Sequence, residues 1–163
     1  MRIGLHGMVR RVWVPRGVKV RQRRQIVYQW QYLALAVDSV RGELYWAWLE
    51  NVKKETMAQL VKEWKETGID ALVRDGSGSH RARLVKEAGV RLINLPAYAP
   101  EHNPAERIIE EIRGKIEGRV YESLQAKRDK AEAFLHELAA EPARVRRLAG
   151  WDWIQEAASQ LPN

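Results

Sequence analysis

The stretch "LPAYAPEHNPAERIIEEIR", residues 95–113, decides the fold because it holds a rigid, proline-rich turn and the start of a helix. Asn103 has a side chain suited to a helix N-cap, and Pro104 suits the first helical position. Glu106 lies three residues after the cap, as in a capping box. The turn therefore fixes the position of Glu106 in the first turn of the helix. The helix is expected to reach Gly118, with three isoleucines on its buried side: Ile108, Ile109 and Ile112.

The segments around this turn predict a mixed α/β sheet with helices on its faces. A short strand opens the chain, and a hairpin follows whose two strands meet at Arg41 and Gly42. Apolar residues at helical spacing predict a helix over 57–64, which Gly68 ends. The other expected elements are a strand at 69–75, a helix at 80–89, a strand at 90–96 and an all-helical tail over 119–163.

The positive charge is concentrated at the amino-terminal end. The net charge is +7, and residues 1–37 alone carry +8 because they contain eight Arg or Lys residues and no Asp or Glu. The segment at 6–24 mixes "RVWV" with the turn "PRG" and is expected to form a two-stranded excursion outside the core. A basic segment beside a nearly neutral body is typical of a surface that binds a polyanion backbone, although a solvated basic loop has the same composition. We therefore expect DNA phosphates to contact these side chains: Arg10, Arg11, Arg16, Lys19, Arg21, Arg23 and Arg24.

The composition argues against several other classes of protein. Cysteine is absent and the four histidines lack the spacing of metal-ligand pairs, so neither a disulfide framework nor a thiolate zinc site is expected. The apolar runs are short, and the first residues do not match a signal peptide. With 163 residues and 45% hydrophobic composition, the chain is expected to fold as a single cytoplasmic domain over 1–163, without a membrane partner.

Asp75 and Glu106 are the acids on which a chemical function would depend. Asp75 ends a predicted buried strand, where open α/β sheets carry their ligand-facing groups. Two carboxylates that converge from different elements repel each other unless cations lie between them, and hard ions such as Mg²⁺ or Mn²⁺ take oxygen ligands. The two acids therefore favour a divalent metal site of the kind that serves phosphoryl transfer.

The same residues also fit purely structural roles. Glu106 could serve only as the acid of a capping box, and Asp75 only as a turn residue beside Gly76 and Gly78. His80 would start a helix by default, and a phosphate contact is its alternative role. The aromatic residues of the predicted hairpin are expected in the core rather than as platforms for base stacking: Trp30, Trp46 and Trp48.

Two stretches carry a resemblance to a known family. "RDGSGSH" at 74–80 and the proline-rich stretch at 95–113 resemble the second and third acidic motifs of insertion-sequence transposases in the Tc/mariner superfamily. The family's second catalytic Asp falls on Asp75, and the Glu of its Asn-Pro-x-Glu motif falls on Glu106, with thirty residues between them. The likeness extends over most of the chain, through "GLHGMVRRVWVPRG" and "LAGWDWIQEA".

This resemblance implies an RNase H-like fold, with a five-stranded mixed sheet flanked by helices and a helical C-terminal tail. It also implies that Asp75 and Glu106 hold Mg²⁺ or Mn²⁺ for the cutting and joining of DNA ends. The expected partners are DNA, as transposon ends and target, and a second copy or a full-length transposase in a dimer.

The chain departs from the family pattern at two places. A bulky apolar residue usually occupies the position of His102. The family's first catalytic Asp belongs to an Asp-Glu pair directly before a segment like "MRIGLHG", and this chain begins at Met1. Asp38 is the nearest strand-borne acid, but it is expected in the hairpin turn, far from the site. With Asp75 and Glu106 alone, we expect weak nuclease activity.

Three functions are compatible with these observations. The first is the catalytic domain of a DDE-type transposase. The second is a non-catalytic remnant that binds DNA or an intact transposase and so limits transposition. The third is an RNase H-like nuclease of repair or RNA processing, which the proline-rich third motif disfavours.

Overall fold

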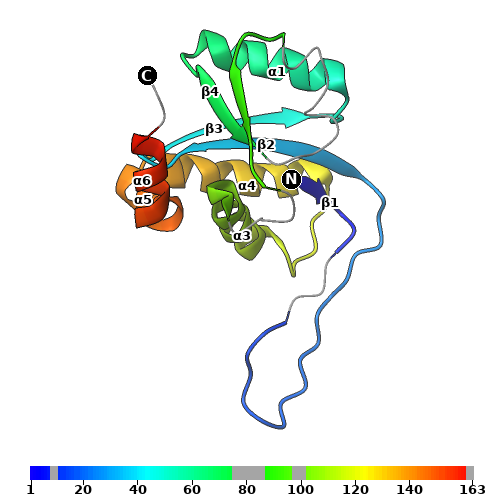
Figure 1. The fold of residues 1–163 in the computed structure, drawn as a ribbon. Coiled ribbons are helices and arrows are strands. Elements are labelled where there is room, and N and C mark those ends of the chain that lie inside the picture. Colours follow the sequence, from blue (N-terminus) through cyan, green and yellow to red (C-terminus); the bar gives the residue numbers. More distant parts are fainter. Residues whose placement is uncertain (8–10, 75–86, 97–101, 161–163) are drawn as a thin grey trace.

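The computed structural model of the chain describes residues 1–7, 11–74, 87–96 and 102–160. Helices lie on both sides of a central sheet, and a long arm extends away from the body (Figure 1). Within the described ranges, no helix combines the length and hydrophobicity that crossing a membrane requires. The elements in chain order are β1 Arg2–Gly4, β2 Trp30–Asp38, β3 Glu43–Leu49, α1 Lys54–Glu66, β4 Ala71–Arg74, β5 Arg91–Asn94, α3 Pro104–Ile116, α4 Leu124–Ala139, α5 Pro142–Ala149 and α6 Asp152–Ser159.

β2 and β3 form the hairpin that the sequence predicts. They pair antiparallel from Tyr32 opposite Leu49 to Asp38 opposite Glu43, and Gly42 adopts a φ of 79° in the turn between them. β1 pairs antiparallel with the start of β2, while β4 and β5 pair parallel in a separate two-stranded sheet. The described strands therefore number five, but they form sheets of three and two strands, whereas the resemblance implies one sheet of five. β1 is short and pairs only with the beginning of β2.

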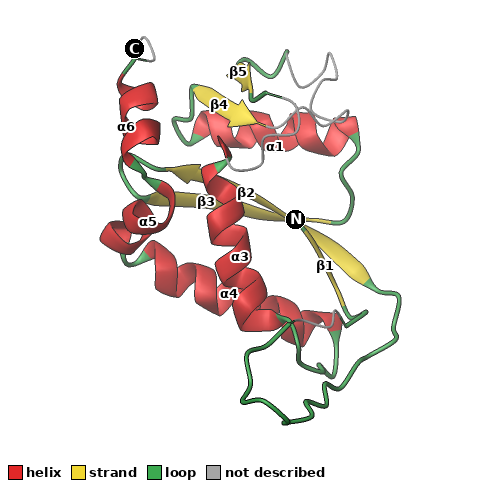
Figure 2. Cartoon of the chain, turned by 60° about the horizontal axis from the view of Figure 1, so that its bottom comes forward, coloured by secondary structure: helices red, strands yellow, loops and turns green. Residues whose placement is uncertain are grey.

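The larger core lies between the three-stranded sheet and helices α3, α4 and α5 (Figure 2). The predicted isoleucine stripe is buried, and both Ile108 and Ile112 have no exposed surface. The helix begins as predicted, since the Asn103 side chain accepts a hydrogen bond from the Ala105 N–H at 3.1 Å and Pro104 occupies the first turn. This core contains Ile3, Leu33, Leu44, Ile108, Ile112, Ile116, Ala131, Phe134, Leu135, Leu138, Val145 and Ala149.

A smaller core lies on the opposite face of the sheet, beneath α1. The predicted apolar repeat of this helix packs against residues of the β4–β5 pair and against small side chains of the hairpin. Gly68 follows the helix with a φ of 93°, a left-handed conformation that glycine adopts without strain. The buried members of this core are Met57, Ala58, Leu60, Val61, Ala88 and Val90.

A buried lysine of the helical tail contacts both the first strand and the residue that follows α3. Lys127 of α4 is only 2% exposed, and its ammonium donates to the Gly4 carbonyl at 2.8 Å and to Glu117 Oε1 at 3.0 Å. A buried ammonium needs such partners because desolvation is costly.

The predicted all-helical tail is confirmed from Leu124 onward, and α5 is a helix that the sequence pattern did not separate.

Residues 11–29, here called the basic arm, leave the body as an extended excursion (Figure 1). They contain no strand, which differs from the two-stranded form that the sequence predicts. The alternating valines have no layer to cover them, and an isolated pair of strands is marginal in water. Backbone hydrogen bonds close the base of the arm, from Gly7 N to Gln25 O at 2.8 Å and from Leu5 N to Gln29 O at 2.9 Å.

The helix expected at 80–89 and the end of the strand expected at 69–75 fall largely or partly outside the described residues. Gly89, at the end of that predicted helix, has a φ of 81°.

Candidate functional site

Glu106 lies in the first turn of α3, where the predicted N-cap turn directs it. Its backbone N–H donates to the Asn103 carbonyl at 3.0 Å, which fixes the turn from which the side chain leaves. The side chain is 41% exposed, so its oxygens are accessible to a ligand. A carboxylate is stabilised at this place because the first turn of a helix carries partial positive charge.

A cavity of about 700 Å³ adjoins this turn. β2, β4, the start of α3 and part of α6 form its walls, and Glu106 is among the residues that line it. Two further acids, Asp38 and Asp70, line the same cavity. Sequence reasoning did not select Asp70, although it directly precedes the strand that leads to Asp75. Acidic residues from three separate parts of the chain therefore line one cavity.

Arg113 is the cation closest to Glu106 among the described contacts. Its Nη1 lies 4.0 Å from Glu106 Oε2, and the same nitrogen makes a much shorter contact with Glu110. Because Glu110 is the nearer partner, the Glu106 carboxylate keeps oxygen surface for another cation. The sequence analysis missed Arg113, but the signal was present, since a residue seven positions along a helix lies on the same face.

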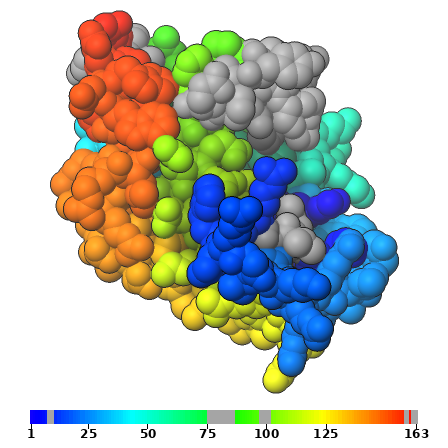
Figure 3. All heavy atoms as spheres, turned by 90° about the horizontal axis from the view of Figure 1, so that it is seen from below, coloured from blue at the N-terminus to red at the C-terminus, as the bar shows by residue number. Residues whose placement is uncertain are grey.

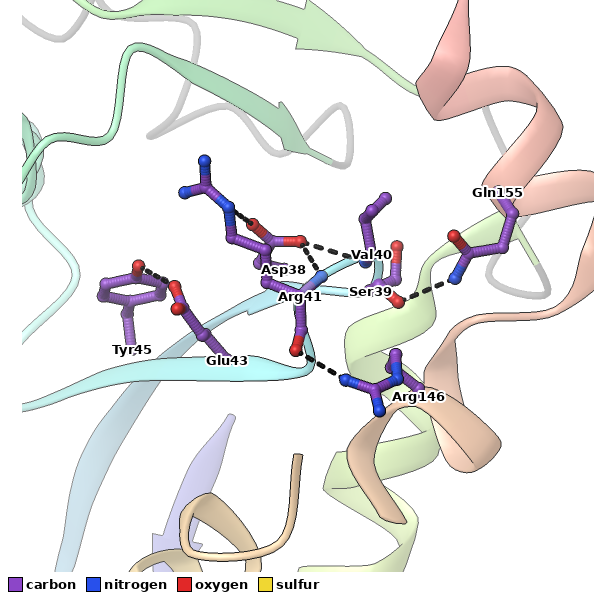
Figure 4. Close-up of polar contacts among 8 residues, drawn as sticks. All are labelled: Asp38, Ser39, Val40, Arg41, Glu43, Tyr45, Arg146 and Gln155. Atoms are coloured by element: carbon purple, nitrogen blue, oxygen red, sulfur yellow. Dashed lines mark hydrogen bonds and ion pairs between the residues drawn. The ribbon is translucent and has the colours of Figure 1, made fainter. Parts of the chain in front are cut away.

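Asp38 is the last residue of β2, at the β2–β3 turn where the sequence predicts it. Its Oδ1 accepts hydrogen bonds from the N–H groups of Val40 and Arg41 at 2.9 and 2.8 Å (Figure 4). Arg146 of α5 holds the same turn by donating to the Arg41 carbonyl at 3.0 Å. The Asp38 carboxylate is thereby committed to the turn. Asp38 is also among the residues that line the same large cavity as Glu106.

The basic side chains of the arm are exposed, as their predicted role requires. Figure 3 shows the arm projecting over one face of the molecule, and Gln25 at its base donates to the Tyr121 carbonyl at 3.0 Å. Arg24 contacts the body, since its Nη2 lies 3.1 Å from His6 Nε2. The exposed basic residues on the described part of the arm are Arg11, Arg16, Lys19, Arg21, Arg23 and Arg24.

Three predicted site residues lie outside the described residues: Asp75, His80 and Arg10. Of the predicted acidic pair, the described structure therefore positions Glu106. Within the described ranges, no group of three or more acidic or histidine side chains is arranged to hold a metal ion. The donor type still fits, because the carboxylate oxygens of Glu106 and Asp75 are hard ligands that suit Mg²⁺ or Mn²⁺.

The tryptophans of the hairpin differ in burial between β2 and β3. Trp46 and Trp48 pack against the larger core, and their indole N–H groups both donate to the carboxylate of Glu132, at 2.9 Å for Trp46. Trp30 is 46% exposed and lies under the Arg2 guanidinium. The predicted core role is thus confirmed for the two tryptophans of β3.

The sequence profile of the family described as "DDE superfamily endonuclease" matches residues 1–127. No curated protein matches the chain. Solved structures of similar fold include two complexes of Mos1. The Mos1 transposase paired-end complex with left transposon end has a TM-score of 0.60 and 13% identity, over 92% of this chain and 53% of that chain. The Mos1 mariner paired end complex with Mn has a TM-score of 0.67 and 15% identity, over 98% of this chain and 52% of that one.

The chain spans about half the length of these Mos1 chains. At this level of identity, the likeness shows the fold, a mixed α/β arrangement with helices on both faces of the sheet.

Proposed function

The chain belongs to the DDE superfamily of endonucleases, and from this premise we propose that it is the catalytic domain of a Tc/mariner-type transposase. In this proposal residues 1–163 act as one RNase H-like domain, and the two observed sheets are parts of one five-stranded mixed sheet. The observation that carries the proposal is the family match over 1–127, which includes Glu106 at its half-exposed position beside the cavity.

Asp75 and Glu106 would hold Mg²⁺ or Mn²⁺. A bound divalent ion neutralises negative charge that develops on phosphate oxygens during strand cleavage and joining. The chain's own contribution is positional: the Asn103 cap and Pro104 fix the first turn of α3 and so limit where the Glu106 carboxylate can reach. Arg113 lies close enough to Glu106 to steady that carboxylate without enclosing it.

The basic arm would bind the DNA backbone, at transposon ends and target. The cations on its described part are exposed, and residues 1–37 contain no Asp or Glu, so these cations can approach phosphates. Such contacts position DNA but carry little sequence information. His80 and Arg10 are proposed to add to this surface, and a dimer with a second copy or a longer transposase would bring two DNA ends together.

We propose that the 163-residue polypeptide by itself is a weak nuclease. Asp75 and Glu106 are the two acids that it offers to the metal, and a site with two carboxylates holds a pair of cations less tightly than a site with three. The alternative function, a DNA-binding or transposase-binding protein that limits transposition, is favoured by one observation. The arm can bind DNA whether or not the acids support chemistry.

Cleavage of supercoiled plasmid tests the proposal. The purified chain in excess over DNA should nick the plasmid slowly with Mn²⁺ or Mg²⁺ and not with EDTA. Glu106→Gln keeps the size of the side chain but removes its charge, and it should abolish the nicking. Glu110→Gln is the matched control, because Glu110 lies one turn along the same helix and contacts the same Arg113. The control should retain activity.

Each outcome separates the two functions. Metal-dependent nicking that Glu106→Gln removes supports the catalytic domain. Nicking that survives in Glu106→Gln would show that the active carboxylate has been misassigned. Tight DNA binding with no nicking at any metal concentration supports the binding protein instead. A fast rate that Asp75→Ala abolishes would contradict the expectation of weak activity.

A further inference from the structure

The short β1–β2 ladder buries one of its faces and exposes the other. Ile3 is 0% exposed because it packs in the larger core. Side chains alternate between the two faces of a strand, so Arg2 and Gly4, on either side of Ile3, lie on the opposite face. Trp30 is directly opposite Gly4 in the antiparallel pairing and shares that face, where 46% of its surface is exposed. An exposed indole thus lies on the side of the ladder that the larger core does not cover.

The pairing continues beyond this ladder into the end of the basic arm, which lies beside the residues that follow β1 (Figure 1). Leu5 N donates to Gln29 O at 2.9 Å, and the ring centroids of His6 and Tyr28 lie 5.2 Å apart. Tyr28 is 72% exposed. It precedes Trp30 by two residues, so their Cα atoms are at most about 7 Å apart. Two exposed aromatic residues therefore lie close together on one extended segment.

A cationic side chain lies near each of these rings. The Arg2 guanidinium carbon lies 5.7 Å from the centroid of the Trp30 ring, which is within the range of a cation–π contact. Arg24 Nη2 lies 3.1 Å from Nε2 of His6, the residue whose ring contacts Tyr28. Both arginines are exposed, and residues 1–37 contain no Asp or Glu. We call this set of residues the aromatic face: Arg2, His6, Arg24, Tyr28 and Trp30.

We propose that the aromatic face binds unpaired nucleotides of a DNA strand. Bases stack on Tyr28 and Trp30, while Arg2 and Arg24 contact the phosphates. The proposal rests on the proposed binding of DNA by the basic arm, which the aromatic face adjoins, and it adds a site for single strands. Aromatic rings that stack on bases, together with a cationic surface that follows the backbone, are the two parts of such a site.

The chemistry of the aromatic face favours unpaired DNA over two other partners. In a duplex, neighbouring bases cover the faces of each base, so the two rings can stack only on bases that have left the helix. A symmetric contact with a second copy of the chain would bring like charges together, which opposes association. A single strand offers phosphates to the arginines and base faces to the rings, and so it matches both kinds of side chain.

Fluorescence anisotropy in the presence of EDTA tests this site without DNA cleavage. The probes are a fluorescein-labelled single strand of twelve thymidines and a labelled duplex of the same length. The double variant Tyr28→Leu, Trp30→Leu keeps apolar side chains but removes both rings, and it should bind the single strand about tenfold or more weakly than the parent. Duplex binding should change by less than about twofold, and the salt slope should stay the same, because no charge has been removed.

Two control variants separate stacking from other roles of these residues. Tyr28→Phe, Trp30→Phe keeps two rings and should bind the single strand within about threefold of the parent. Trp13→Leu removes a fully exposed ring of the basic arm that lies outside the aromatic face, and it should change the affinity less than the leucine double variant does. Circular dichroism checks that each variant is folded.

Photo-crosslinking of the parent chain detects the contact without any substitution. A single strand that carries 5-iododeoxyuridine should crosslink to Tyr28 or Trp30, which peptide mass spectrometry identifies. If the leucine double variant does not fold, these crosslinks decide the outcome.

Selective loss of single-strand binding in the leucine double variant, with crosslinks at Tyr28 or Trp30, supports the proposal. It is overturned if that variant binds the single strand as tightly as the parent, if either control loses as much affinity, or if the crosslinks lie elsewhere. A changed mass in sedimentation with unchanged DNA affinity would assign the face to a second copy and also overturn it. Duplex binding that persists in any of these cases leaves the proposed function of the basic arm intact, so the two failures are distinguishable.

Discussion

The helical side of the sheet and the basic arm contain similar apolar residues, but these residues are buried on the helical side and exposed in the arm. Ile112 on α3 has no exposed surface, whereas Trp13 in the arm is fully exposed and Ile26 is 66% exposed. On the helical side, each apolar side chain meets a covering layer. In the arm, a similar β-branched alternation has no layer above it and lies among like charges that repel each other. Stability should therefore depend on the helical side, and DNA affinity on the arm.

Truncating a buried isoleucine should give the largest effect. Ile112→Ala leaves a cavity between α3 and the sheet and should lower the free energy of unfolding by about 4 kcal/mol. Urea denaturation followed by circular dichroism measures this change. Ile26→Ala in the arm is the control, and it should cost less than about 0.5 kcal/mol. Equal losses in the two variants would show that the arm is packed in solution.

Two glycines with positive φ allow the same comparison at the backbone. Gly42 has a φ of 79°, and a Cβ added there would lie 2.2 Å from the Pro142 carbonyl oxygen, so Gly42→Ala must move the turn away from α5. We expect a loss of about 3 kcal/mol, from the left-handed backbone and the displaced packing. Gly17 in the arm has a φ of 89° with nothing within 4 Å.

Gly17→Ala should therefore cost at most about 1 kcal/mol, which thermal denaturation of both variants can measure. If Gly42→Ala were as mild as Gly17→Ala, the contact between the hairpin turn and α5 would have little energetic importance.

The sequence predicted those elements whose causes are local. The α3 helix follows from Asn103, Pro104 and the isoleucine spacing, and it begins and buries its residues as expected. The Glu106 position follows from the same turn. The β2–β3 hairpin was equally predictable from the sequence, because alternating apolar residues flank a glycine turn.

The features that the sequence did not predict depend on distant partners. Lys127 is buried because it meets the carbonyl of Gly4, 123 positions away, and no local pattern distinguishes it from a solvated lysine. The absence of strands in the described part of the arm has the same origin. Its alternation of valines is typical of a strand, but strand formation also needs a covering layer that composition does not reveal.

Reversing charge in the arm should alter DNA binding and leave folding intact. The triple variant Arg11→Glu, Arg21→Glu, Arg23→Glu should weaken binding by roughly 30-fold, about 2 kcal/mol. The reason is that fewer phosphate contacts form, so fewer counterions are released from the DNA when the protein binds. The slope of log K against the logarithm of the salt concentration should also become shallower by about 3. Fluorescence anisotropy over a salt series measures both quantities.

The matched control places the same three charge reversals on α1 and the residue before it, at Lys53, Lys54 and Lys62, which are exposed. It has the same net charge as the arm variant. Comparable loss of affinity in both variants would mean that overall charge, rather than the arm, attracts DNA.

The smallest expected effect concerns a surface ion pair on the helical side. Arg144 of α5 donates to Glu137 of α4 at 2.9 Å, and this hydrogen bond holds the pKa of the Glu137 carboxyl below its ordinary value. A carboxyl with a lowered pKa in the folded state adds stability above its unfolded pKa, and that stability is lost as pH falls through the folded pKa. Glu137→Gln should therefore be slightly less stable than the parent near neutral pH. The difference should begin to shrink below pH about 4.3 and vanish once the pH is below the folded pKa of Glu137.

A double-mutant cycle isolates the pair from other effects of pH. In an Arg144→Met background, Glu137→Gln should have a smaller pH-dependent effect, because the hydrogen bond that is the largest cause of the lowered pKa has been removed, while Lys115 and Lys130 remain. Exposed pairs contribute little, since water screens them and ordering two long side chains costs entropy. A loss here as large as that of Ile112→Ala would contradict the comparison, because it would make charge rather than burial the main source of stability on the helical side. A small loss, confined to pH above the folded pKa of Glu137, leaves burial as the interaction that holds α4 and α5 against the sheet.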